Sequence, residues 1–62
     1  MKVRELIRLL ERDGWVLVGS VGSHRQYKHP TKKGRVTVPV HSLGDELKIG
    51  TLHNILRQAG LK

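Results

Sequence analysis

The 62-residue sequence contains no cysteine, no phenylalanine, one tryptophan and one tyrosine. Without cysteine there is neither a disulfide bond nor a cysteine-based zinc site, so one small apolar core must stabilise the fold. The same absence fits a reducing compartment, and we expect a cytoplasmic protein. No segment approaches the roughly 18 consecutive apolar residues of a membrane helix, and the first residues lack the pattern of a signal peptide. We therefore expect one domain, residues 1–62, with no membrane association.

Acidic residues are also scarce. Five Asp and Glu stand against twelve Lys and Arg, which gives a formal net charge of +7. Residues 22–36 contain five basic residues and no acidic residue, so this segment alone carries +5; the five are Arg25, Lys28, Lys32, Lys33 and Arg35. Such a charge on a short chain indicates a polyanionic partner, and it favours nucleic acid over a membrane surface.

The spacing of apolar residues predicts two amphipathic helices that flank three strands. The first helix carries an apolar stripe at helical spacing and stops at Gly14; its members are Val3, Leu6, Ile7 and Leu10. Short β-type runs predict strands at residues 15–18, 24–29 and 35–40, with a turn at residues 19–22. Pro39 places the third strand at a sheet edge or strand end. A second helix carries its stripe from Ile49 to Ala59. The expected fold is α+β, with a three-stranded antiparallel sheet and both helices on one face.

Side chains alternate along a strand, so the second and third strands should present two different faces. Val36, Val38 and Tyr27 are expected to face the core, and Trp15 is also expected to be a core residue. The helix-free face then carries five polar side chains: His24, Gln26, Lys28, Arg35 and Thr37. Lysine and arginine bind phosphate, and an exposed histidine can exchange a proton near neutral pH. This face suits chemistry on a phosphodiester, although the same residues also serve simple phosphate binding.

Other candidate residues lie outside these two strands. His41 opens a loop, where it either reaches a ligand or is an ordinary loop residue. Lys48 and Thr51 flank the start of the second helix, which either binds a phosphate or forms an ordinary capping turn. His24 and His29 are five residues apart on a strand and should point to opposite sides, so no metal site is expected. The basic segment has no acidic residue to complete a serine-hydrolase triad.

Several sequence motifs follow one another at defined places along the chain. The most specific is Gly22-Ser23-His24-Arg25-Gln26-Tyr27-Lys28-His29-Pro30. It is followed by Val36-Thr37-Val38-Pro39-Val40-His41, by Lys48-Ile49-Gly50-Thr51-Leu52 and by Ile55-Leu56-Arg57-Gln58-Ala59-Gly60. Together these motifs resemble those of the HicA toxins, the small mRNA interferases of HicA–HicB toxin–antitoxin systems. The resemblance covers essentially the whole chain.

The resemblance implies a fold like that of the double-stranded-RNA-binding domain, with the element order α-β-β-β-α. It implies an endoribonuclease that cleaves mRNA and arrests translation and growth. The family's essential histidine falls on His24. Ser23 stands where many family members carry a second glycine, and we do not expect this difference to abolish activity. A HicB-type antitoxin that covers the active site is also implied, and the toxin alone is expected to be monomeric.

We therefore expect metal-independent cleavage of single-stranded RNA without a cofactor, with His24 as general base or general acid. Contacts to the RNA are expected from nine residues: Ser23, Arg25, Lys28, Lys32, Lys33, Arg35, His41, Lys48 and Thr51. One alternative is a non-catalytic module, either a small double-stranded-RNA-binding domain or a ribosome-associated basic protein. Another is a protein that only sequesters a partner. Of these classes, only the enzyme has a special use for His24.

Overall fold

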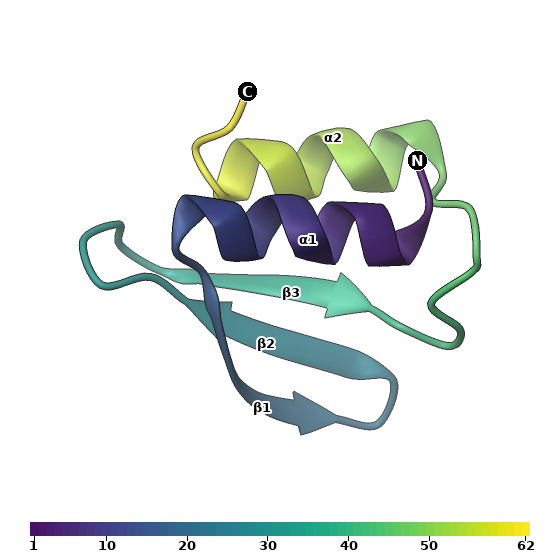
Figure 1. Cartoon of the computed structure of the whole chain (residues 1–62), viewed down its shortest axis with the longest axis horizontal. Helices are drawn as coiled ribbons and strands as arrows, with labels where there is room; N and C mark the ends of the chain where they lie inside the picture. The colour runs from purple at the N-terminus through teal and green to yellow at the C-terminus, as the bar shows by residue number, and fades with distance from the viewer.

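The structure, a computed structural model, describes all residues 1–62. In chain order it contains α1 (Val3–Asp13), β1 (Val16–Val21), β2 (His24–Lys28), β3 (Arg35–Pro39) and α2 (Ile49–Gln58). Both helices lie on the same side of an antiparallel sheet with the strand order β1-β2-β3 (Figure 1). The predicted α+β fold is therefore confirmed, and it is consistent with a fold like that of the double-stranded-RNA-binding domain. Neither helix has the length and apolar character required to cross a membrane.

Helix α1 forms because its apolar residues share one face and both of its ends have hydrogen-bond partners. At the start, the Glu5 carboxylate accepts a hydrogen bond of 2.8 Å from the backbone N–H of Lys2. At the end, Gly14 has a φ of +105°, and its N–H donates to the carbonyl of Glu11. Glycine enters this left-handed region without the steric cost that a Cβ would bring. The helix therefore stops at the glycine that the sequence indicated.

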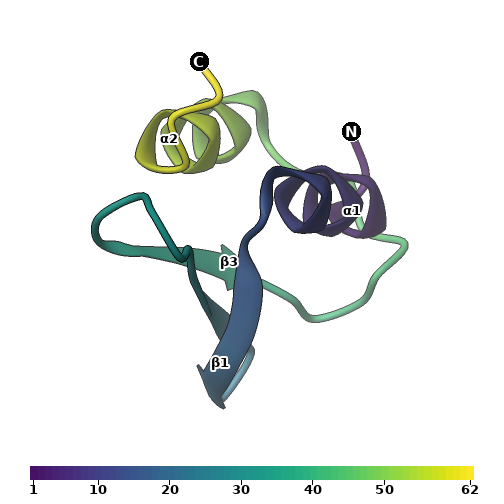
Figure 2. The same ribbon diagram turned by 60° about the vertical axis from the view of Figure 1, so that its left-hand side comes forward.

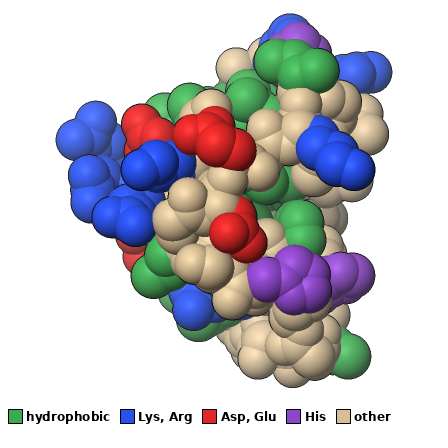
Figure 3. Space-filling model, turned by 90° about the vertical axis from the view of Figure 1, so that its right-hand side faces the viewer, with side chains coloured by type: hydrophobic (Ala, Val, Ile, Leu, Met, Phe, Trp, Pro, Cys, Tyr) green, Lys and Arg blue, Asp and Glu red, His purple; other side chains and the backbone are tan.

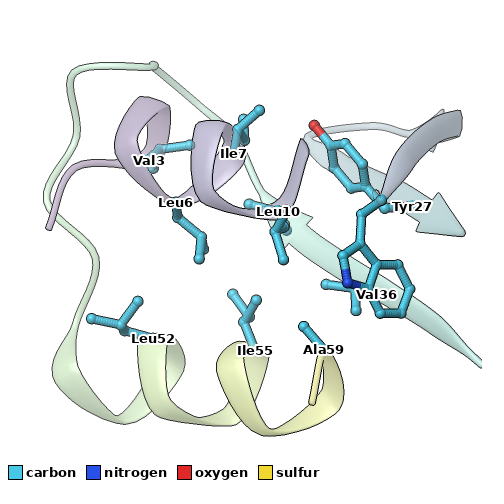
Figure 4. Packing of buried hydrophobic residues seen from close by; sticks show 11 residues of the cluster. Val3, Leu6, Ile7, Leu10, Tyr27, Val36, Leu52, Ile55 and Ala59 are labelled. Atoms are coloured by element: carbon cyan, nitrogen blue, oxygen red, sulfur yellow. The ribbon is translucent and has the colours of Figure 1, made fainter. Parts of the chain in front are cut away.

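The core is wholly apolar and lies between the two helices and the sheet. Figure 4 shows the stripe of α1 facing that of α2, with Tyr27 and Val36 of the sheet beside them. Trp15 is only 2% exposed, which confirms that it is a core residue. The buried cluster has eleven members: Val3, Leu6, Ile7, Leu10, Trp15, Tyr27, Val36, Val38, Leu52, Ile55 and Ala59. No charged group is buried among them, so apolar burial is the main stabilising term.

The first strand is longer than the sequence suggested. We expected a turn over residues 19–22, but β1 continues to Val21, which pairs with His24. Only Gly22 and Ser23 form the turn, and Gly22 has a φ of +58°. A two-residue hairpin needs such a left-handed residue at its first position, and glycine provides it at little cost. The register shifts by one residue between Leu17 and Gly19, which forms a bulge in β1.

The other two strands each end one residue earlier than expected. Strand β2 stops at Lys28 because the ring of His29 accepts hydrogen bonds from the backbone N–H groups of Thr31 and Lys32, which fold the chain into a turn. Strand β3 stops at Pro39. It lies at an edge of the sheet, as its proline predicted.

The helices do not cover the sheet evenly. Helix α2 packs over β3, whereas β1 lies at the opposite edge and runs away from both helices (Figure 2). Four apolar side chains of β1 are consequently exposed: Val16, Leu17, Val18 and Val21.

Candidate functional site

The outer face of the sheet is defined by three residue pairs that bridge β2 and β3. These pairs are His24 with Pro39, Gln26 with Thr37, and Lys28 with Arg35. The pairs between them, which include Tyr27 with Val36, point toward the helices and the core. Because facing residues of an antiparallel pair share a side of the sheet, the three pairs all point away from the helices. This outer face therefore carries the five polar residues that alternation predicted.

His24 is the first residue of β2 and follows the hairpin turn directly. It is exposed, and its position is set on both sides because it pairs with Val21 of β1 and with Pro39 of β3. A side chain on the central strand of a sheet has a better-defined direction than one on a loop. His24 is thus a solvent-accessible histidine held on a rigid element.

Two cations face each other on the outer face. Lys28 of β2 is directly opposite Arg35 of β3, and neither strand contains an acidic residue. Like charges in this arrangement destabilise a sheet, and a bound anion would relieve the repulsion. The Arg35 guanidinium is also oriented, because its Nη1 donates a hydrogen bond of 2.7 Å to Oε1 of Gln26. The pair therefore suits a phosphate that lies on the sheet.

A hollow of about 440 Å³ lies where β3 ends and α2 begins. It brings together three predicted contact residues, His41, Lys48 and Thr51, which are far from His24 in sequence. Its other lining residues are Val3, Pro39, Asp45, Glu46 and Leu47. The two carboxylates were not among the predicted site residues, and they make this hollow less favourable for an anion than the outer face.

The strand ladder brings the start of the loop that contains His41 to the end of the sheet that carries His24. His24 faces Pro39, and the backbone N–H of Val40 donates a hydrogen bond of 2.6 Å to the carbonyl of Ser23, which extends the pairing by one residue. His41 follows two residues after Pro39, in a bend outside β3, so it emerges at the end of the sheet where His24 begins β2. Figure 3 views this end of the molecule and shows a patch of histidine side chains at the lower right, with a further histidine apart from it at the top.

Two predicted contact residues are placed away from the outer face. Arg25 pairs with Val38 and Ser20, so it points to the helix side of the sheet, where it is half-buried. Lys32 is held by an ion pair, because its Nζ lies 2.6 Å from Oδ2 of Asp13 and donates to the carbonyl of Ala59 at 2.9 Å. By contrast, the neighbouring Lys33 is exposed in the loop between β2 and β3.

His29 has a structural position that sequence reasoning did not find. Its Nδ1 accepts two backbone N–H bonds, from Thr31 and Lys32, so its Nε2 carries the proton and donates to the carbonyl of Asp13. Its ring meets that of Trp15 edge to face, with centroids 5.2 Å apart. Thr31 and Lys32 are sequence neighbours of this histidine, but only the tertiary fold brings Asp13 to it, so no local sequence signal could have indicated that contact.

The Asp13 carboxylate is the centre of this contact, which we call the Asp13 clamp (Asp13, Trp15, His29 and Lys32). The hydrogen bond from Lys32 holds the pKa of the Asp13 carboxyl below its ordinary value, and the indole N–H of Trp15, at 3.2 Å, adds to the effect. The clamp joins the end of α1 to the loop after β2 and, through Lys32, to the end of α2.

Comparison with known proteins identifies the family of the chain. The family model described as the HicA toxin of bacterial toxin–antitoxin systems matches residues 3–61, which is nearly the whole chain. No curated protein gives a significant match. The matched segment contains the outer face, the hairpin before His24 and the hollow. The chain therefore belongs to the HicA family of toxins from bacterial toxin–antitoxin systems.

Proposed function

We propose that this chain is the toxin of a type II toxin–antitoxin system and acts as an endoribonuclease on mRNA. Its activity would arrest translation and growth until a HicB-type antitoxin neutralises it. The observation that carries the proposal is the position of His24, an exposed histidine fixed on the same sheet face as the opposed cations Lys28 and Arg35. Phosphate binding alone would need the cations but not the histidine.

The proposed reaction uses the 2′-hydroxyl of the RNA as nucleophile. A neutral histidine removes the proton of this hydroxyl, a bond forms between the 2′-oxygen and the adjacent phosphorus, and the bond from phosphorus to the 5′-oxygen breaks. The leaving 5′-oxygen takes up a proton. Deoxyribose has no 2′-hydroxyl, so the mechanism restricts cleavage to RNA. His24 fills either the base or the acid role.

The reaction needs a second group for the other proton transfer, and His41 is the best-placed candidate. It follows Pro39, the strand partner of His24, by two residues and is exposed just beyond the end of β3. The lysines are less suited, because a lysine is normally charged near neutral pH and can only donate. One histidine would thus act as base while the other, protonated, acts as acid.

Phosphate contacts come first from Lys28 and Arg35, which neutralise charge that develops on the phosphorus oxygens. Lys48 and Thr51 at the start of α2 and the exposed Lys33 extend the basic surface along the RNA. Ser23 is expected to contact the RNA from the hairpin turn that precedes His24. Arg25 and Lys32 are the least accessible of the predicted contacts, because of the positions described above.

The proposal is tested with purified chain and mRNA, in buffer with and without a chelator. We expect cleavage in both buffers and a loss of about 100-fold or more in His24→Ala. The matched control is His53→Ala, which removes a histidine from α2 and should cut at the wild-type rate. Unchanged cutting by His24→Ala would refute the assignment of this residue. Loss of cutting in chelator would refute the metal-independent mechanism.

A non-catalytic RNA-binding module is the second candidate, because the fold and the charge of +7 suit it equally well. The same experiment separates the two functions. A binding module would bind RNA without cutting it, and its affinity would not depend on His24 more than on any single basic residue.

A further inference from the structure

Strand β1 has the composition of a buried strand but lies at an exposed edge. Val16 is 59% exposed, Val18 is 51% exposed and Val21 is 69% exposed. Val16 and Val21 pair with residues of the outer face, whereas Leu17 pairs with Tyr27 and points to the helix side. Apolar side chains on both faces are typical of strands that are covered on both sides. In this molecule neither face of β1 is covered by a helix (Figure 2).

The outer edge of β1 also lacks the usual protection against strand pairing. Edge strands commonly carry a lysine, a proline or a strong bulge that discourages another chain from adding to the sheet. Residues 14–21 contain no charged residue and no proline, and the bulge between Leu17 and Gly19 is the single protective feature. The opposite edge differs, because β3 ends in Pro39 and α2 packs over it. The two edges of the sheet are therefore not equivalent.

We infer that β1 is a docking edge to which an acidic partner protein adds an extended segment as a fourth strand. Main-chain hydrogen bonds to the free edge would supply affinity, and apolar side chains of the segment would cover Val16, Val18 and Val21. The positive charge of the chain favours an acidic partner. The basic strand β2 lies directly beside β1, and no acidic residue occurs between Gly14 and Arg35. An acidic protein is attracted to this region.

Charge also argues against the other occupants of this edge. A second copy of the chain would bring another +7 against the first, so the two copies repel each other. RNA is not suited to an uncharged apolar strand, because its affinity comes from phosphate contacts with basic residues. The inference therefore separates two surfaces: the outer face for RNA and the β1 edge for protein.

Docking at β1 has a direct consequence for His24. Val21, the last residue of β1, pairs with His24 across the sheet. A segment seated along β1 thus reaches the end of the sheet that carries His24, two strand spacings or roughly 10 Å from it, where the rest of the partner can block the outer face. The inference rests on the proposed function in one respect, because the acidic partner that it places on the β1 edge is the antitoxin of that proposal.

The test uses the HicB-type antitoxin of the proposed function as the probe. Hydrogen exchange of wild-type chain is measured with and without the probe, and we expect slower exchange of the β1 amides in the complex. Two variants, Val16→Lys and Val18→Lys, place a charge on β1. Each should weaken binding at least about tenfold, as expected for a central contact of an interface. Leu43→Lys is the matched control, because Leu43 is 44% exposed outside the sheet and the change in charge is the same.

Each outcome decides the inference. The inference would be overturned if all three variants bound the probe with equal affinity and hydrogen exchange of the β1 amides did not change. It would also be overturned if the probe did not bind the chain at all. Concentration-dependent self-association that Val18→Lys abolishes would show that a second copy is the occupant, which also contradicts the acidic partner. RNA cleavage by the free chain is measured separately. Failure of that assay contradicts the proposed ribonuclease, whereas slower β1 exchange in the complex would still support the docking edge.

Discussion

The ammonium group of Lys32 lies 2.6 Å from the carboxylate of Asp13, across nineteen residues of sequence. The same ammonium donates to the carbonyl of Ala59 at the end of α2, where a cation also interacts favourably with the helix dipole. One side chain thereby links three segments: the end of α1, the loop after β2 and the end of α2. This lysine stabilises the fold at the point where its segments would otherwise separate.

The Asp13 clamp predicts acid sensitivity. Because the folded-state pKa of Asp13 is lowered, its contribution to stability is fully present above the unfolded value of about 3.9 and is lost as pH falls through the folded value. Asp13→Asn should unfold at a lower temperature than wild type at pH 7, and this difference should shrink below pH 4. Thermal melts followed by circular dichroism across this range measure it. Asp45→Asn is the control, and an equal loss in both variants would contradict the prediction.

Two glycines with positive φ should differ in their tolerance of alanine. At Gly22, a Cβ meets no atom within 4 Å, so Gly22→Ala should cost only the backbone penalty of about 1–2 kcal/mol. At Gly14, a Cβ would lie 2.9 Å from Nε2 of His29, in the middle of the Asp13 clamp. Gly14→Ala should therefore be clearly the more destabilising substitution in urea denaturation. Equal urea midpoints and equal slopes of the unfolding free energy against urea for the two variants would contradict this ranking.

The facing cations predict a specific salt dependence of RNA binding. Each phosphate contact contributes to the slope of affinity against salt, so Lys28→Gln and Arg35→Gln should each reduce that slope by about one unit or somewhat less. Arg12→Gln removes the same charge from the exposed side of α1 and should leave the slope nearly unchanged. Titration of a non-cleavable, 2′-deoxy oligonucleotide at several salt concentrations gives the slopes. Identical slopes in all three variants would indicate that the outer face does not bind phosphate.

The position of His41 just beyond the strand partner of His24 predicts its effect on the pH profile. If His24 and His41 transfer the two protons, the cleavage rate of wild type should fall on both the acid and the alkaline side of an optimum. His41→Ala should lower the rate at the optimum by about 100-fold and remove one of these two limbs. A uniform reduction with both limbs intact would mean that His41 only contacts the RNA. Arg35→Gln provides that comparison, since it removes a contact without removing a titrating group.

The parts of the fold that the sequence predicted are those with a local periodic pattern. The stripe from Val3 to Leu10 defines α1, and alternation from Val36 to Val38 shows which side of β3 faces the core. Alternation also placed His24 on the outer face correctly, since it depends only on counting residues along a strand. The end of β1 was missed, because its last residues before Gly22 look like a turn by composition and become a strand only by pairing with β2.

The site was less predictable where it depends on tertiary contacts. Lys32 and Lys33 are indistinguishable in sequence, but the fold directs Lys32 to Asp13 and leaves Lys33 exposed. Likewise, His29 stands in the same motif as His24, yet the fold directs its Nε2 to the carbonyl of Asp13. The emergence of the loop with His41 at the same end of the sheet as His24 follows from the register of β2 and β3, which the sequence does not specify.

The Asp13 clamp and His24 lie at opposite ends of the sheet, because β2 runs from His24 at one end to the turn beside His29 at the other (Figure 1). Substitutions at well-separated positions generally change the free energy independently of one another. Residues around His24 and His41 can therefore vary during evolution without loosening the contact that fixes the helix ends. A lineage could alter the RNA or the antitoxin of the proposed function while it keeps the same small scaffold.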